Sequence, residues 1–121
     1  MQVCHVAHQQ LVTELLPHMC AAGEEARVVT VASSAHAACG PIDLNDPSWD
    51  LRTWDSTVAY GESKLANVLF AQELAQRYPL SAEARLTSLC VHPGIVATSL
   101  FREFGSGASG SGIAGMLSYY Y

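Results

Sequence analysis

Tyr60 and Lys64 have the residue types and the spacing of an acid–base pair. In a helix, residues four apart lie above one another on one face, so the ammonium group would sit close to the phenol. A nearby positive charge favours the phenolate and lowers the pKa of a tyrosine from its unperturbed value of about 10. Such a phenol can exchange a proton with a carbonyl or alcohol oxygen. The spacing alone is also compatible with an amphipathic helix that leaves both side chains in solvent.

Two flanking segments carry further polar groups. The sequence RVVTVASS, residues 27–34, predicts a β-strand that ends in Ser33 and Ser34. Residues 86–91 predict a second apolar strand, which is followed by His92, Pro93 and Gly94. Serines also favour turns and helix caps, so a purely structural role for the serine pair stays open.

The elements that must position these groups follow from periodicity. Residues 3–19 predict a helix with Val6, Leu11, Leu15 and Leu16 on one broad side and with Pro17 marking strain or fraying near its end. Residues 57–78 predict a second helix, stopped by Pro79. Residues 40–56 hold two prolines, two tryptophans and five aspartates or asparagines, which predicts a long irregular loop. Strand, crossover helix and strand form a βαβ unit, and the run Val28–Val31 is typical of a parallel strand covered on both faces. Ligands of such folds bind at the carboxyl ends of the strands, where Ser34 and Pro93 fall.

Composition excludes several classes of protein. Six lysines and arginines against eleven aspartates and glutamates give a formal net charge of −5, and no basic cluster suits nucleic acid. The sequence has no apolar run long enough to span a bilayer and no secretory leader pattern, so we expect a cytoplasmic protein. The scattered cysteines predict reduced thiols rather than disulfides, and the neighbours Cys4, His5 and His8 lack a well-spaced fourth ligand for zinc, so no metal is expected.

Taken together, the serine strand, the tyrosine helix and the Pro-Gly turn resemble the short-chain dehydrogenase/reductase family. The wording SKLANVLFAQELAQRY is similar to its retinol-dehydrogenase-like branch, and so is the insert between Ser34 and Tyr60. The resemblance covers residues 1–104 and implies the C-terminal part of an NAD(P)-binding domain, an α/β fold with a partial Rossmann-type, doubly wound parallel sheet. Residues 105–121 are rich in glycine and serine and predict a flexible tail.

The resemblance also implies roles for individual residues. Ser34 would hold the substrate oxygen, Tyr60 would act as catalytic acid/base, and Lys64 would lower the pKa of Tyr60 and hydrogen-bond the nicotinamide ribose. The implied cofactor is NADP or NAD, and the implied reaction is hydride transfer between an alcohol and a carbonyl of a small molecule. The resemblance to this branch implies a lipid or retinoid-like substrate. The cofactor-binding residues that the resemblance implies are Tyr60, Lys64, Pro93, Gly94, Val96 and Thr98.

Two departures from the family pattern leave other functions open. Cys4 stands where the family places an asparagine that supports proton return, and the sequence contains no glycine-rich phosphate-binding turn. We therefore expect a fragment that lacks the N-terminal half of the fold, with incomplete cofactor binding. The alternative is a catalytically inactive form, either a remnant or an interaction protein that forms homo-oligomers through the helices 3–19 and 57–78.

Overall fold

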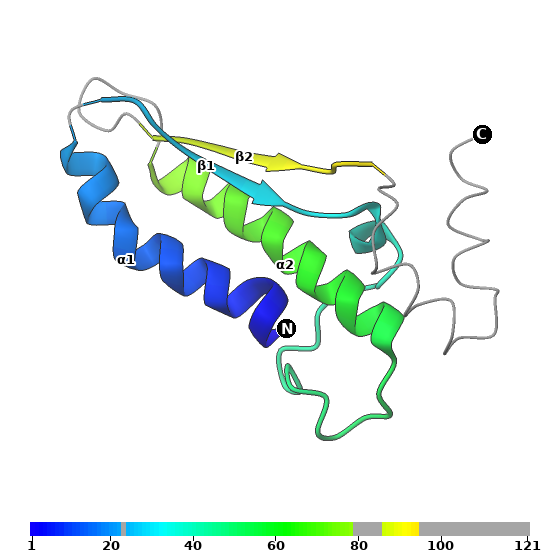
Figure 1. Ribbon diagram of the computed structural model, residues 1–121. Coiled ribbons are helices and arrows are strands. Elements are labelled where there is room, and N and C mark those ends of the chain that lie inside the picture. The colour runs from blue at the N-terminus through cyan, green and yellow to red at the C-terminus, as the bar shows by residue number, and fades with distance from the viewer. Residues whose placement is uncertain (23, 79–85, 95–121) are drawn as a thin grey trace.

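The computed structural model describes residues 1–22, 24–78 and 86–94. Its helices and strands form a small α/β unit in which both long helices lie along one side of a pair of strands (Figure 1). The predicted α/β class is confirmed. In chain order the elements are η1 (Gln2–Val6), α1 (Ala7–Ala21), β1 (Ala26–Val31), η2 (Ser34–Ala37), α2 (Ser56–Arg77) and β2 (Leu86–Val91).

The two strands are parallel, as the βαβ pattern predicts. Their register runs from Ala26 opposite Leu86 to Val31 opposite Val91. The Ala32 amide donates to the Val91 carbonyl at 2.9 Å, which continues the pairing one residue further. Because α2 connects strands that point the same way, the residues after β1 and those after β2 come to the same edge of the sheet.

The hydrophobic core lies toward the amino ends of the strands. Leu16 of α1, Leu74 of α2, Val28 of β1 and Leu86 of β2 form its buried cluster. The half of α2 that begins near the carboxyl ends of the strands buries mostly small or polar residues instead. This division leaves the carboxyl edge of the sheet to polar groups.

In the part of the chain that the structure describes, no element covers the opposite face of the sheet, contrary to the prediction that β1 is covered on both faces. Val29 and Val31 are each 51% exposed, and Leu89 and Val91 of β2 are also exposed. Side chains alternate between faces along a strand, so burying Val28 against the helices turns its neighbour Val29 outward. Within the described residues, both helices that pack on the sheet do so on the Val28 side.

The first helix differs from its prediction at both ends. It begins with one turn of π-helix, in which the Val6 amide reaches back to the Met1 carbonyl at 3.4 Å, and it continues through Pro17 to Ala21. Proline within a helix removes one backbone donor but does not always end the helix. Leu16 is buried while Leu11 and Leu15 are exposed, so the apolar face is narrower than the periodicity indicates.

The second helix and the loop agree with their predictions. Asp55 caps α2 by accepting hydrogen bonds from the Thr57 and Val58 amides at 2.9 and 3.0 Å, which explains why the helix begins at Ser56. The predicted tail, residues 105–121, and the proposed boundary at residue 104 lie outside the described residues. No described helix is both long enough and apolar enough to cross a membrane.

Candidate active site

Tyr60 and Lys64 lie on one face of α2, as their spacing predicts. The Lys64 ammonium nitrogen is 5.5 Å from the centre of the Tyr60 ring. The same nitrogen donates a hydrogen bond to the Val31 carbonyl, at 3.1 Å, at the end of β1. Both side chains are half-buried, so they remain accessible to a small molecule.

The serine pair lies just beyond β1, because the strand ends at Val31 rather than at Ser34 as predicted. Ser33 has extended backbone and caps η2 by accepting a hydrogen bond from the Ala35 amide at 3.3 Å. Ser34 is the first residue of η2 and is half-buried. The structural role of a helix cap therefore applies to Ser33, and the Ser34 hydroxyl is not the group that caps η2.

Gly61, directly after Tyr60, allows η2 to approach α2 closely. A Cβ added at Gly61 would lie 2.5 Å from the Cβ of Cys39 and 2.8 Å from the carbonyl oxygen of Ala35. Real side chains do not make such short contacts, and one of these obstacles is backbone. The glycine thus brings the element that carries Ser34 against the helix that carries Tyr60. The sequence signal was a glycine within the first two turns of a predicted helix, since a glycine inside a helix usually has a packing reason.

Replacing Gly61 by alanine should separate η2 from α2. Alanine normally stabilises a helix interior by about 0.5–1 kcal/mol relative to glycine. Here we expect the opposite, a lower melting temperature, because η2 must shift. The melting temperature should be compared with that of Gly40→Ala, where a φ of 73° strains the backbone but the added Cβ has nothing within 4 Å. A Gly61→Ala variant as stable as the wild type would contradict this packing.

Asn67 is a buried polar residue that the sequence reasoning missed. It is 1% exposed, and its side-chain nitrogen Nδ2 donates to the Cys4 carbonyl at 3.1 Å and to the Val31 carbonyl at 3.3 Å. Its oxygen Oδ1 lies 2.8 Å from His5 Nδ1. An amide oxygen only accepts, so His5 carries its proton on Nδ1 in this arrangement. Cys4 takes part through its main-chain carbonyl, so this contact does not depend on the type of its side chain.

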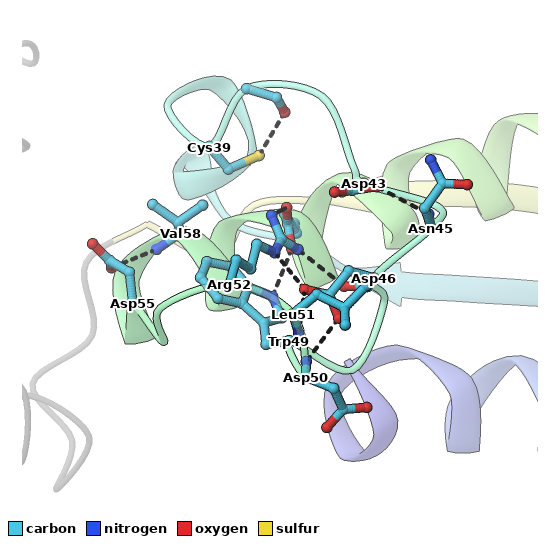
Figure 2. A network of polar contacts seen from close by, with 12 residues as sticks. Cys39, Asp43, Asn45, Asp46, Trp49, Asp50, Leu51, Arg52, Asp55 and Val58 are labelled. Carbon is cyan, nitrogen blue, oxygen red and sulfur yellow. Dashed lines mark hydrogen bonds and ion pairs between the residues drawn. The ribbon is translucent and has the colours of Figure 1, made fainter.

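A second cluster anchors the long loop to the other side of α2 (Figure 2). Glu62 is 1% exposed and receives two hydrogen bonds from Arg52, each of 2.9 Å, in a bidentate ion pair. Asp46, also buried, has its Oδ2 3.5 Å from Arg52 Nε. The hydrogen bond with Glu62 raises the pKa of Arg52 above its ordinary value, and the charge of Asp46 adds to this effect. Buried carboxylates require such pairing, and the pairing holds the loop 40–55 against the helix next to Tyr60.

Trp49 completes this cluster. Its Nε1 donates to Glu62 at 2.9 Å, and the Arg52 guanidinium lies 3.7 Å from the centre of its ring. Its φ of 65° places a bulky residue in the left-handed region, a conformation that persists only where the surroundings impose it. The Asp46 carboxylate accepts hydrogen bonds from the Asp50 and Leu51 amides at 2.7 and 3.2 Å, which closes this part of the loop on itself.

Cys39 lies between this cluster and η2. Burial raises the pKa of its thiol; a backbone hydrogen bond opposes the effect, and the negative charge of Glu62 adds to it. The cysteines Cys4, Cys20, Cys39 and Cys90 are all free thiols.

The remaining predicted cofactor residues lie partly outside the described chain. Pro93 and Gly94 follow β2 at the same edge of the sheet as Ser34, and Gly94 has a φ of 80° that favours glycine. Val96 and Thr98 lie outside the described residues. The donors at this edge, the Lys64 ammonium and the hydroxyls of Ser34 and Tyr60, are of the kind that binds ribose and carbonyl oxygens.

A parallel βαβ unit with polar groups at the carboxyl edge of its strands is the arrangement of dinucleotide-binding α/β folds, and comparison with known proteins agrees. Human retinol dehydrogenase 13 is 39% identical over 103 residues, which are 85% of this chain and 30% of the relative. Human retinol dehydrogenase 12 is 41% identical over 101 residues, or 84% and 30%. An Arabidopsis thaliana dehydrogenase/reductase, the SDR family member FEY, is 34% identical over 105 residues, or 85% and 27%.

A solved structure shows the same architecture. The crystal structure of an uncharacterised protein from Mycobacterium paratuberculosis superposes with a TM-score of 0.65 at 39% identity, over 82% of this chain and 34% of the other. No family model matches the chain.

The chain belongs to the short-chain dehydrogenase/reductase family, in its retinol-dehydrogenase-like branch, and its fold is a partial Rossmann-type α/β fold. It spans about 30% of the length of the human retinol dehydrogenases that it matches.

Proposed function

We propose that the chain provides the Ser-Tyr-Lys site of an NAD(P)-dependent oxidoreductase that interconverts an alcohol and a carbonyl. The observation that carries the proposal is the position of Lys64. Its ammonium group, 5.5 Å from the Tyr60 ring, is tied to the Val31 carbonyl at the edge of the sheet where η2 begins with Ser34. Three groups with complementary acid–base chemistry thus come from two elements that pack directly against each other.

In the proposed reaction each side chain has one task. The Ser34 hydroxyl hydrogen-bonds the carbonyl oxygen of the substrate and so orients it. The Tyr60 hydroxyl gives that oxygen a proton in reduction and takes it back in oxidation, while the positive charge of Lys64 stabilises the phenolate that remains. NAD(P) supplies hydride transfer when bound. Lys64, Tyr60, Pro93 and Gly94 are the described residues that we propose hold its nicotinamide half.

The substrate class rests on the relatives. Two of them are named retinol dehydrogenases, so we propose a retinoid or a similar lipid alcohol or aldehyde as the substrate. Comparing turnover with NADH and with NADPH identifies the cofactor.

The proposal is tested by turnover of all-trans-retinaldehyde with NADPH or NADH by the purified chain, and by a pair of adjacent variants. Ser34→Ala should lower kcat strongly, because the substrate oxygen loses its hydrogen bond. Ser33→Ala is the matched control; it removes a cap worth about 1 kcal/mol, so it should cost stability more than rate. Equal rates for Ser34→Ala and the wild type would show that Ser34 does not orient the substrate oxygen.

A second candidate function is association with another protein chain without catalysis. Leu11 and Leu15 on α1 and Leu69 on α2 are 59%, 45% and 49% exposed, which suits helices that pack against a second copy. The same purified protein decides between the two. Absence of turnover, together with a mass in solution that doubles as concentration rises, would favour the association function.

A further inference from the structure

We infer that Asn67 is a positioning residue that fixes Lys64 through the Val31 carbonyl. This inference rests on the proposed role of Lys64 in the reaction. Asn67 lies three residues after Lys64 on α2, so the two side chains project from neighbouring positions of the same helix face. Both end on one oxygen atom, that of Val31.

The Asn67 carboxamide has no freedom to turn. Its Nδ2 group donates to the Cys4 carbonyl at 3.1 Å and to the Val31 carbonyl at 3.3 Å, which uses both of its N–H bonds. Its oxygen accepts from His5 at 2.8 Å. A flipped amide would place the NH2 group against His5 Nδ1 and the oxygen against two carbonyls. In a side chain that is 1% exposed, such repulsion cannot be relieved by water.

The Val31 carbonyl is therefore a fixed acceptor with two donors. A carbonyl oxygen has two lone-pair directions, and Asn67 occupies one of them. The Lys64 ammonium, at 3.1 Å, takes the other. Lysine is a flexible side chain with three rotatable N–H donors. The hydrogen bond to the fixed Val31 carbonyl therefore keeps the Lys64 ammonium group near the Tyr60 ring.

Asn67 also connects this acceptor to the π-helical turn. The Cys4 carbonyl belongs to η1, which is far from Asn67 in sequence but beside it in the fold. Three elements, η1, β1 and α2, thus meet at one buried amide. Without the Asn67 amide, the Cys4 and Val31 carbonyls each lose a hydrogen-bond donor, and the Lys64 ammonium group can turn to other acceptors.

Lys64 is the one lysine of the sequence, so a lysine label reports on this side chain alone. Protein labelled with [13Cε]lysine should give a single Cε signal in a proton–carbon NMR spectrum of the full chain. In the wild type we expect two resolved Hε resonances, because a fixed side chain holds the two protons in different surroundings. In Asn67→Leu, which keeps the branching and the number of heavy atoms but removes the amide, the two should collapse to the one averaged position of a mobile lysine.

Ser88→Ala is the matched control. It removes a 2.9 Å side-chain hydrogen bond from β2 to the Ala71 carbonyl of α2, without contact to Lys64, and should leave both Hε resonances in place. If Asn67→Leu does not fold, Asn67→Ala is judged by the same criterion. Two resolved and unshifted Hε resonances in the Asn67 variant, or one averaged resonance in the wild type, would overturn the inference. Because the spectrum requires no turnover, an inactive wild type with the expected spectra would refute the proposed function and leave the positioning intact.

Discussion

Tyr60→Phe should lower kcat by about 10²–10⁴-fold, the range that general acid–base catalysis contributes. The phenyl ring remains, so its packing next to Lys64 and Gly61 is kept while the exchangeable proton is lost. The free energy of unfolding should change by less than about 1.5 kcal/mol, the net value of one hydrogen bond. Retinaldehyde reduction under saturating NADPH measures the first effect, and urea denaturation measures the second.

The control for this prediction is Tyr78→Phe. Tyr78 follows Arg77 as the C-cap residue of α2, and it packs against the hydrophobic core rather than at the carboxyl edge of the sheet. The same chemical change there should leave kcat at the wild-type value. Similar rates for wild type and Tyr60→Phe would show that Tyr60 is not the acid/base, whatever the reaction.

Glu62→Ala should be the most destabilising of the substitutions that leave the proposed catalytic groups untouched. It removes both hydrogen bonds to Arg52 and the acceptor of Trp49 Nε1, and it leaves a cavity on α2. Breaking a buried ion pair costs about 3–5 kcal/mol. Because Arg52 is 28% exposed and can still pair with Asp46, we expect the lower end, roughly 3 kcal/mol by urea denaturation.

The matched control is Glu73→Ala on the same helix. Glu73 pairs with Arg77 one turn away, and both side chains are more than half exposed. Exposed ion pairs contribute about 0–1 kcal/mol, so the variant should stay close to the wild type. If the two glutamate variants lose equal stability, then the Glu62 cluster does not hold the loop. A loop released by Glu62→Ala should also be cut faster by trypsin after Arg52 than in the control.

The candidate site was partly predictable from the sequence. Predicting that Tyr60 and Lys64 lie on one face required only the period of a helix. A periodic segment as long as α2 is the most reliable kind of sequence signal. The supporting residues were not predictable in the same way. Nothing local indicates that Asn67 is buried, because the Cys4 carbonyl that accepts its hydrogen bond lies 63 residues earlier in the chain. Glu62 likewise has no local sign of burial, because its partner Arg52 comes from the long loop that packs against α2.

The sequence by itself determined the local elements and indicated the type of chemistry that we propose. Helical periodicity, β-branched runs and capping residues such as Asp55 act between neighbours in the chain, so they can be read without the fold. Only the tertiary structure decided which polar groups are buried and which apolar ones are left out. A glycine is needed at position 61 because η2 approaches α2 closely there. Val29 is exposed because the described helices cover one face of the sheet. Burial and long-range hydrogen bonds depend on residues that are distant in the chain, and a local pattern carries no information about them.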